Sequence, residues 1–418
     1  MLGARQVGKT WLMQEFGRKH FKKVAYIRFD QDERMKLSFE QDYDMKRIIE
    51  SIQLSVGFKI TAKDTLIILD EIQECPRALT SLKYFCEDAR EYHVAAAGSL
   101  LGLFEHNGTG FPVGKVDVMH LYPMTYREFL VATGHELYAE ALDKKDWRIV
   151  TDFASKYVEL LRLYYVVGGM PEAVERYIVT GDFAAVRAVQ EGILLGYRRD
   201  FSKHAPAEET SRISLIWNSI PEQLARENKK FMCSGVQAGM RTRDLEVAMQ
   251  WLLDTGLIYK VVRVSKPAFP PDAYREGAFK AFFLDVGLLA AKVNLPVEVI
   301  LDGNRIFTEF KGALAEQYVQ QQLRSACGIS PYYWATANSQ SEVDFLVQSG
   351  VEMLPLEVKA EVNLRSKSLK TFCKKFRVKK AVRVSMAPWC EQDMPMEDDK
   401  ICRLINLPLY AVHLLPFV

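Results

Sequence analysis

The chain has 418 residues and a net charge of only +2, with 49% apolar and 26% charged residues. This composition is ordinary for a folded globular protein of about two to four domains. No apolar run approaches the ~20 residues that a membrane span requires, and no signal-like segment precedes the first motif. Because the net charge is small, any affinity for nucleic acid must come from local basic segments. Seven scattered cysteines without a C-x-x-C pair indicate reduced thiols, so we expect a cytoplasmic protein without structural zinc.

The first motif is a phosphate-binding loop at the start of the chain. Residues 3–10 read G-A-R-Q-V-G-K-T and fit the pattern G-x-x-x-x-G-K-[ST]. The two glycines allow a tight turn whose N–H groups point at a phosphate, and the following helix N-terminus favours the same anion. The lysine adds a charge for the β- and γ-phosphates, and the threonine hydroxyl can ligate Mg²⁺. The residues expected to bind nucleotide are Gly3, Ala4, Arg5, Gln6, Val7, Gly8, Lys9 and Thr10.

A second motif completes this predicted site. The apolar run Leu66–Leu69 ends in Asp70 and Glu71, which is typical of a strand buried on both faces of a parallel sheet. Asp70 would hold Mg²⁺, and Glu71 would polarise the water that attacks the γ-phosphate. Ser99 follows another strand-like run and is either a γ-phosphate sensor or a helix N-cap. Singly, the motifs could be a glycine-rich turn and an acidic loop, but in this order they predict ATP or GTP binding.

Residues 1–130 alternate between expected strands and helices. This pattern predicts an α/β fold of the P-loop NTPase type, a three-layer sandwich whose ligand site lies at the carboxyl ends of the strands. A strand normally precedes the phosphate loop, but only Met1 and Leu2 stand before it, so we expect the first strand to be missing. Residues 114–121 are expected to form a fifth strand. Lys115 or Arg127 could supply a phosphate-sensing cation, although a solvated charge is the simpler interpretation.

Two further segments precede the C-terminal part. Residues 131–205 are predicted to form a helical lid, interrupted by the turn Gly168–Pro171. Residues 206–300 contain two amphipathic helices followed by two strand-like runs, which predicts a winged helix-turn-helix. Arg241 and Arg243 begin its second helix, where contacts with DNA would be made. The alternative is a winged helix that serves only as a spacer between proteins.

Residues 301–418 carry a possible metal site. A helix with Glu316 is followed by strands that contain Asp344 and, thirteen residues later, Glu357-x-Lys359. Residues two apart on a strand share a face, so Glu357 and Lys359 would point the same way. The three carboxylates would hold Mg²⁺, and Lys359 would orient a water or offset developing charge. The alternative is a surface hairpin with ordinary charges.

A basic segment lies close to this site in sequence. Residues 365–383 contain nine lysines and arginines and no acid, as binding to the phosphate backbone of DNA would require. A solvated basic face is the alternative. Phe372 and Phe376 are expected to be core anchors rather than groups that stack on bases. The nine residues are Arg365, Lys367, Lys370, Lys374, Lys375, Arg377, Lys379, Lys380 and Arg383.

Together these motifs resemble the prokaryotic family of AAA-type ATPases that carry a C-terminal domain of unknown function. The resemblance covers nearly the whole chain, and its motifs are specific only in combination. They are the phosphate loop, Leu69–Gln73, Ala97–Ser99, Leu121–Met124 with Arg127–Phe129, Gly168–Glu172, Glu342–Phe345 and Leu356–Lys359.

The resemblance implies an ATP-binding domain, a winged helix and a C-terminal domain similar to restriction endonucleases. Glu316, Asp344, Glu357 and Lys359 then fall at nuclease active-site positions. The first hypothesis is therefore an ATPase coupled to DNA binding and Mg²⁺-dependent DNA cleavage. The second is an ATP-dependent switch whose C-terminal domain binds DNA or a protein partner without cutting. A third is a nucleotide-binding signalling protein whose basic helix contacts a partner protein. The oligomeric state stays open.

Overall fold

The computed structural model describes residues 1–106, 112, 114–226, 229–302, 308–336, 340–361, 366–396 and 401–417. The chain forms two compact units. Unit 1 contains Met1–Tyr122 and Gln250–Leu257, and unit 2 contains Pro123–Met249 and Ile258–Val418. No helix among the described residues combines the length and the apolar character needed to cross a membrane.

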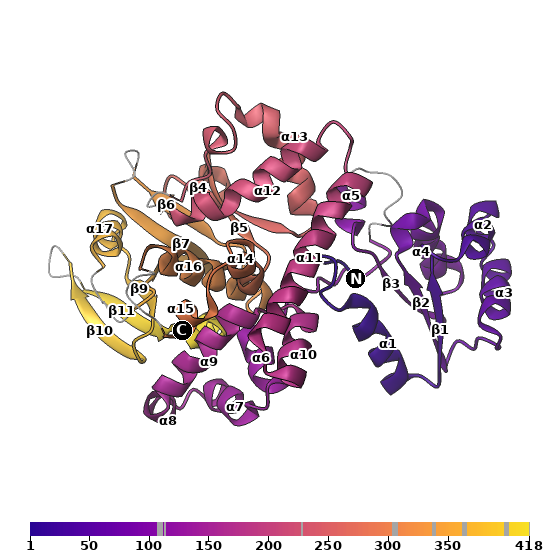
Figure 1. Ribbon diagram of the computed structural model, residues 1–418, viewed down its shortest axis with the longest axis horizontal. Coiled ribbons are helices and arrows are strands. Elements are labelled where there is room, and N and C mark those ends of the chain that lie inside the picture. Colours follow the sequence, from indigo (N-terminus) through magenta and orange to yellow (C-terminus); the bar gives the residue numbers. More distant parts are fainter. Residues whose placement is uncertain are drawn as a thin grey trace. The chain divides into compact units, whose positions relative to one another are not determined.

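Unit 1 is built on a parallel sheet of three strands in the order β1-β2-β3 (Figure 1). The central strand, β2, is buried at every position because helices cover both faces of the sheet. On one face, Met13 of α1 packs against Leu66 and Ile68, and on the other Ile67 packs with Phe85 of α4. The elements are α1 (Lys9–His20), β1 (Lys23–Arg28), α2 (Glu33–Gln41), α3 (Met45–Val56), β2 (Thr65–Asp70), the 3₁₀ turn η1 (Ile72–Glu74), α4 (Pro76–Asp88), β3 (His93–Ala97) and α5 (Leu101–His106).

The region where a strand should precede the phosphate loop is irregular. Leu2 forms one parallel bridge with His120, and its N–H donates to the Met119 carbonyl at 2.8 Å. The Leu121 N–H donates back to the Leu2 carbonyl, also at 2.8 Å. The strand expected over residues 114–121 is therefore wrong beyond this single bridge.

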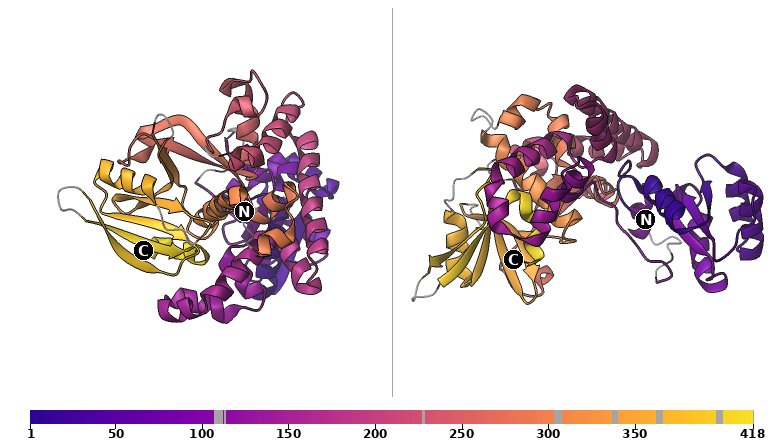
Figure 2. Two further views of the ribbon diagram at one scale, coloured as in Figure 1. Left: turned by 60° about the vertical axis from the view of Figure 1, so that its left-hand side comes forward. Right: turned by 90° about the horizontal axis from the view of Figure 1, so that it is seen from below.

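Unit 2 contains a mixed sheet of eight strands in the order β10-β11-β9-β8-β7-β6-β4-β5. Figure 2 shows its C-terminal strands as one twisted layer. Strand β7 pairs with β6 on one side and with β8 on the other, and both pairs are antiparallel. The strands are β4 (Ile258–Val264), β5 (Arg275–Phe283), β6 (Tyr332–Ala335), β7 (Glu342–Ser349), β8 (Glu352–Val358), β9 (Lys380–Ser385), β10 (Cys390–Pro395) and β11 (Ile401–Pro408).

The expected two-stranded wing does not stand alone. β4 and β5 pair with each other as predicted, but β4 also pairs in parallel with β6, so the hairpin is the edge of the eight-stranded sheet. The reason is burial: β5 is buried over its last six residues and packs against α12 and α16. The predicted wing is thus part of a larger core.

Among the described residues, twelve α-helices, from α6 to α17 in the chain, belong wholly or partly to unit 2. The helices are α6 (Tyr126–Ala132), α7 (Glu136–Lys144), α8 (Trp147–Asp152), α9 (Ala154–Val167), α10 (Pro171–Thr180), α11 (Phe183–His204), α12 (Thr210–Ala225), α13 (Thr242–Asp254), α14 (Val286–Lys292), α15 (Val297–Asp302), α16 (Thr308–Ser325) and α17 (Lys367–Phe376). Helix α13 crosses the division, since its last residues belong to unit 1.

The turn Gly168–Pro171 is hydrogen-bonded to the first residues of unit 2 and to Asp285. The Met124 N–H donates to the Gly169 carbonyl at 2.7 Å, and the Gly169 N–H donates to buried Asp285 at 2.7 Å. A Cβ on Gly169 would lie 2.2 Å from the Met124 carbonyl oxygen. Glycine is required here because two backbone segments approach closely. Close packing of the backbone therefore explains the glycine in this turn, and no catalytic role is needed to account for it.

Candidate functional site

The phosphate loop has the geometry that its sequence predicts. Gly8 adopts the left-handed conformation directly before α1, with φ of 97°. A Cβ on Gly3 would lie 2.2 Å from the Leu121 carbonyl oxygen, so that position also requires glycine. Ala4 and Val7 are buried, whereas Arg5 and Gln6 are exposed. The loop is therefore held by its apolar side chains, which leaves its backbone to meet a ligand.

Lys9 is buried inside the loop that it follows. Its ammonium donates to the carbonyl oxygens of Gly3 at 2.8 Å and Ala4 at 2.7 Å. Burial lowers the pKa of Lys9 to about 8, although Glu71 and Asp70 oppose this shift. A phosphate at the loop would supply the negative charge that this desolvated lysine lacks.

Asp70 joins the two halves of the site. The Thr10 hydroxyl donates to Asp70 Oδ2 at 2.7 Å, and the Glu71 N–H donates to Asp70 Oδ1 at 3.0 Å. The Tyr26 hydroxyl, from the neighbouring strand β1, also donates to Oδ2 at 2.9 Å. Burial and the carboxylate together raise the pKa of Tyr26, so it stays a donor. Sequence reasoning missed Tyr26, although the strand that carries it was predicted.

Glu71 is held by two side chains. Its backbone has φ of 49°, which turns the residue out of β2. Gln73 donates from Nε2 to Glu71 Oε2 at 2.6 Å, and the Ser99 hydroxyl donates to the same oxygen at 3.3 Å. The structure therefore brings Ser99 to the predicted site, where it is a partner of Glu71. Gln73 was missed as a functional residue, although it belongs to the motif that starts at Leu69.

A divalent ion fits beside Thr10 and Asp70. A hydroxyl and a carboxylate are hard oxygen ligands, and Mg²⁺ typically takes one or two such protein groups together with phosphates. The hydrogen bond of 2.7 Å between them shows that both oxygens reach one place. These two residues would hold the ion, and the bound ion would neutralise negative charge on the phosphates.

Two of the three predicted metal ligands of unit 2, Glu316 and Asp344, instead lie beside a lysine. Lys280, on β5, is fully buried, and its ammonium lies 2.5 Å from Glu342, 3.3 Å from Glu316 and 3.9 Å from Asp344. Burial opposes protonation of Lys280, but the three acids outweigh it and raise its pKa. Lys229 forms a second ion pair with Glu316. Two ammonium groups therefore already face the three carboxylates of this cluster.

Glu357 is engaged by other partners. It forms an ion pair with Lys359 at 2.6 Å and accepts from the Leu369 N–H at 3.2 Å. Asp344 accepts from the Val358 N–H at 2.7 Å, so it does reach the end of β8. Among the described residues, no three acidic, histidine or cysteine side chains gather as a metal-binding group. The donor set as it stands does not fit Mg²⁺, because ammonium groups occupy its acceptors.

The basic segment divides into two parts with different surroundings. On α17, Leu369 and Phe372 are buried, which confirms Phe372 as a core anchor, and Phe376 packs on Trp334. The lysines and arginine that are exposed are Lys367, Lys370, Lys374, Lys375, Arg377 and Lys379. Arg383 does not belong to this face, because it is buried in β9 and donates to Asn406 at 3.1 Å. Arg365 lies outside the described residues.

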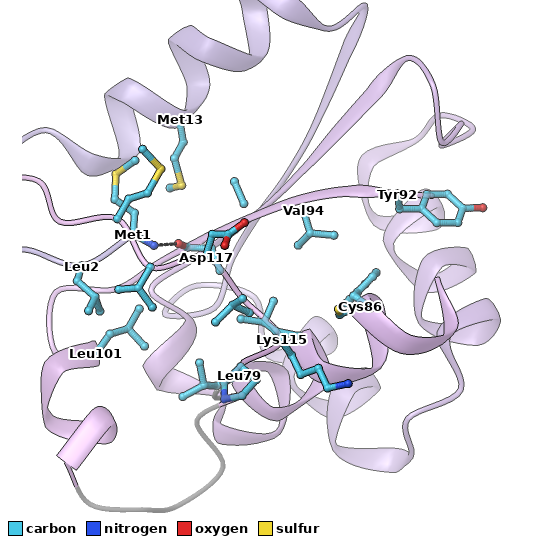
Figure 3. Close-up of a pocket in the computed structure, with 18 of the residues that line it drawn as sticks. Met1, Leu2, Met13, Leu79, Cys86, Tyr92, Val94, Leu101, Lys115 and Asp117 are labelled. Atoms are coloured by element: carbon cyan, nitrogen blue, oxygen red, sulfur yellow. Dashed lines mark hydrogen bonds between the residues drawn. The ribbon is translucent and has the colours of Figure 1, made fainter. Parts of the chain in front are cut away.

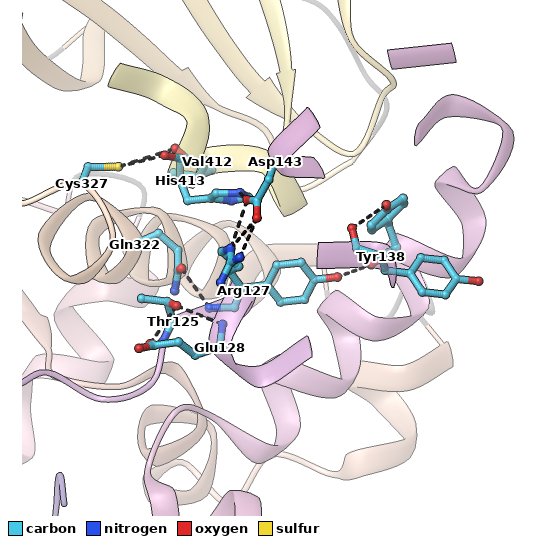
Figure 4. Close-up of polar contacts among 11 residues, drawn as sticks. Thr125, Arg127, Glu128, Tyr138, Asp143, Gln322, Cys327, Val412 and His413 are labelled. Carbon is cyan, nitrogen blue, oxygen red and sulfur yellow. Dashed lines mark hydrogen bonds and ion pairs between the residues drawn. The ribbon is translucent and has the colours of Figure 1, made fainter. Parts of the chain in front are cut away.

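The other candidate cations have acidic neighbours. Lys115 pairs with Glu87 at 2.8 Å. Arg127 donates to both oxygens of Asp143, which also faces His413 at 3.7 Å (Figure 4). Arg241 and Arg243 lie beside Asp244, at 3.9 and 3.7 Å, and their side chains are largely exposed. Ordinary ion pairs therefore account for Lys115 and Arg127.

Comparisons with known proteins agree with the geometry of unit 1. Residues 1–130 match the family model described as an AAA domain. The N-terminal part of the chain is therefore similar to AAA domains. Residues 158–298 and 311–410 match models of two domains of unknown function, DUF8612 and DUF4143. Neither description names a winged helix or a nuclease, so both interpretations stay predictions, as do the predicted domain boundaries.

No curated protein matches the chain. Among solved structures, a Walker-type ATPase of Pyrococcus abyssi is similar with a TM-score of 0.43 and 13% identity. The alignment covers 70% of this chain and 89% of that one.

Proposed function

We propose that this protein hydrolyses ATP with Mg²⁺ at the site formed by residues 3–10, Asp70 and Glu71. The observation that carries the proposal is the hydrogen bond of 2.7 Å between Thr10 and Asp70, because it joins the two motifs into one site. The loop N–H groups and Lys9 bind the phosphates. Glu71, oriented by Gln73 and Ser99, accepts a proton from the attacking water.

Three substitutions test this assignment. Glu71→Gln is expected to lower kcat at least 100-fold while ATP binding persists, because the amide keeps the shape but loses the base. Lys9→Ala and Asp70→Asn should weaken the binding of Mg-ATP. Glu74→Gln, a nearby acid without a role in the proposed site, is the matched control and should keep wild-type turnover. Wild-type turnover by Glu71→Gln would contradict the role given to Glu71.

We also propose that unit 2 binds DNA through α17 without cutting it. The observation in favour is that α17 buries its apolar side and exposes Lys367, Lys370, Lys374 and Lys375. Contacts between lysines and phosphates release counterions, so such binding must weaken with salt. The ion pairs of Lys280 and Lys359 with the carboxylates support binding over cleavage, which favours the second sequence hypothesis over the first.

The DNA proposal is tested by binding and cleavage assays on the same samples. Lys370→Gln/Lys374→Gln should weaken binding similarly for all DNA sequences. The slope of log K against log salt concentration should fall by about two, one for each lysine removed. Glu357→Gln, whose amide oxygen can still accept from the Leu369 N–H, should bind as the wild type does. Lys63→Gln/Lys83→Gln in unit 1 is the matched charge control. Cleavage with Mg²⁺ or Mn²⁺ that Glu357→Gln abolishes would instead establish the nuclease hypothesis.

A further inference from the structure

The two sides of strand β2 offer a nucleotide different surroundings. Beside β3, on one side, lies a cavity of 520 Å³ that is lined mainly by apolar side chains, with Met13 and Val94 among them (Figure 3). Lys115 also lines this cavity, but its ammonium pairs with Glu87 of α4. On the other side of β2 lies β1, which ends in an arginine, Arg28.

The sheet fixes the place of Arg28 opposite Asp70. The two residues are partners in the parallel register of β1 and β2, and neighbouring strands lie about 4.8 Å apart. The pairing continues past them, since the Phe29 N–H donates to the Asp70 carbonyl at 3.1 Å. Ligands of a parallel sheet bind beyond the carboxyl ends of its strands, and both Arg28 and Asp70 stand at that end.

The Arg28 side chain lies on the face of the sheet at which Thr10 and Asp70 meet. Residues two apart on a strand share a face, so Arg28 lies on the same face as Tyr26. The Tyr26 hydroxyl donates to Asp70 Oδ2 at 2.9 Å, and the Thr10 hydroxyl donates to the same oxygen at 2.7 Å. Arg28 is therefore one step further along this face, towards the ligand edge of the sheet.

Asp30 holds the Arg28 guanidinium in a fixed orientation. Nε lies 2.7 Å from Asp30 Oδ1, and Nη2 donates to Asp30 Oδ2 at 2.9 Å, which makes a bidentate pair. A guanidinium has five N–H donors, so this pair engages two of them and three remain for a further acceptor. The hydrogen bond with Asp30, with smaller contributions from Tyr26 and Glu71, raises the pKa of Arg28. Because 42% of its side chain is exposed, a ligand can reach this permanent cation.

Stability alone does not account for an arginine at this place. Ion pairs between exposed side chains contribute little to folding. The chemistry of the site does need a second cation, because negative charge in phosphoryl transfer is spread over three oxygens of the γ-phosphate. Lys9 supplies one point charge at the loop, whereas a planar guanidinium can meet such oxygens with two parallel N–H bonds.

We propose that Arg28 is a catalytic residue of this ATPase, which donates from β1 to the γ-phosphate of ATP, and that Asp30 positions its guanidinium. The proposal rests on the ATP hydrolysis proposed above. In that reaction a water oxygen bonds to the γ-phosphorus, the bond from this phosphorus to the β–γ bridging oxygen breaks, and ADP leaves. Glu71 accepts the proton of the water, and Arg28 stabilises the charge on the γ-oxygens during this step.

Four variants of the full chain test the assignment. Arg28→Gln removes the charge, Arg28→Lys keeps the charge without the planar fork, and Asp30→Asn weakens the bidentate pair. Arg18→Gln is the matched control, because Arg18 also lies in unit 1 and forms an exposed ion pair, with Glu15 of α1. The measurements are kcat with saturating Mg-ATP and the affinities for ADP and for an ATP analogue that is not hydrolysed.

Arg28→Gln is expected to lower kcat at least about 100-fold, because arginines that touch a transferring phosphoryl group typically contribute about 10³–10⁵-fold. It should weaken binding of the analogue at least about tenfold and change the affinity for ADP less than about twofold, since ADP lacks the γ-phosphate. Arg28→Lys should recover part of this affinity but little of kcat. Asp30→Asn should lower kcat about tenfold without affecting ADP, as a positioning role requires. Arg18→Gln should match the wild type in all three measurements.

Wild-type kcat in Arg28→Gln would overturn the proposal. An equal loss of affinity for ADP and for the analogue would also overturn it, because Arg28 would then support the fold rather than the γ-phosphate. Wild-type kcat in Asp30→Asn would remove the positioning role. Hydrolysis that Glu71→Gln abolishes but Arg28→Gln does not would refute only the role of Arg28, whereas a wild-type chain that neither binds nor hydrolyses ATP would refute the proposed function and this assignment with it.

Discussion

Replacing Lys280 with methionine tests whether a protein cation holds the carboxylates of unit 2 together. Methionine keeps the length of the side chain and removes the charge. Lys280 is fully buried, and its three acidic neighbours lie within 3.9 Å. Removing one member of a buried ion pair typically costs about 3–5 kcal/mol, because the remaining charge is left uncompensated. With about 2–4 °C per kcal/mol, the melting temperature of unit 2 should fall by about 6–20 °C.

The assay is thermal unfolding at neutral pH, with and without millimolar Mn²⁺. Because the variant leaves the carboxylates of Glu342 and Asp344 without the cation that they face, Mn²⁺ should recover part of its stability by binding the folded state. The wild type should show no such gain. Lys280→Met/Glu342→Gln, which removes a negative charge as well, should be more stable than the single variant.

Lys260→Met is the matched control for Lys280→Met. Lys260 lies on β4, and its ammonium sits over the ring of Phe279 rather than against a carboxylate. Its loss should cost less than about 1 kcal/mol. Two results would refute the reasoning: a Lys280→Met protein as stable as the wild type, or equal stabilisation of both by Mn²⁺. The second would return Glu316 and Asp344 to the list of metal ligands.

The remaining predictions concern single side chains. Burial lowers the pKa of His413 from 6.5 in the unfolded chain to about 4. Between these two values the unfolded chain binds more protons, so the free energy of unfolding falls as the pH drops through that range. His413→Gln should flatten this pH dependence in unfolding measured from pH 7 to 4. Tyr26→Phe should raise the Mg²⁺ concentration needed for half-maximal ATP hydrolysis severalfold, since Asp70 loses a hydrogen-bond donor. A titration with Mg²⁺ measures this concentration. Gln73→Ala should lower kcat about tenfold with little change in KM, and restoration by Gln73→Glu would contradict a hydrogen-bond donor role.

The nucleotide site could be predicted because its chemistry is local in sequence. A loop that turns around a phosphate needs Gly3 and Gly8 at fixed spacing, and a buried strand that ends in Asp70 needs an apolar run before it. In the structure the Thr10 hydroxyl donates a hydrogen bond to Asp70. Tyr26 escaped notice because tyrosine in a strand is usually a packing residue, although its strand ends at the same edge of the sheet.

The surroundings of the carboxylates in unit 2 could not be predicted, because the decisive group is distant in sequence. Lys280 lies 36 residues before Glu316 and on a strand that was interpreted as a wing. One signal was available: it is a lone charge in the apolar run Ala278–Leu284, and a buried lysine requires acidic partners. The sheet partner of β4 was hidden for the same reason, since β6 follows about 70 residues later and only the fold brings them together.

The division of the chain has a consequence for how unit 1 can be isolated. Its residues Gln250–Leu257 are separated from Tyr122 by a long insertion that belongs to unit 2. A Cβ on Gly256 would lie 3.5 Å from the Ala4 nitrogen, so the returning segment packs beside the phosphate loop. A fragment that stops at residue 130 lacks this segment, and a protease that cuts within the insertion leaves it attached to unit 2. Unit 1 is therefore not one continuous N-terminal stretch of chain, because it includes residues that are synthesised more than a hundred residues after Tyr122.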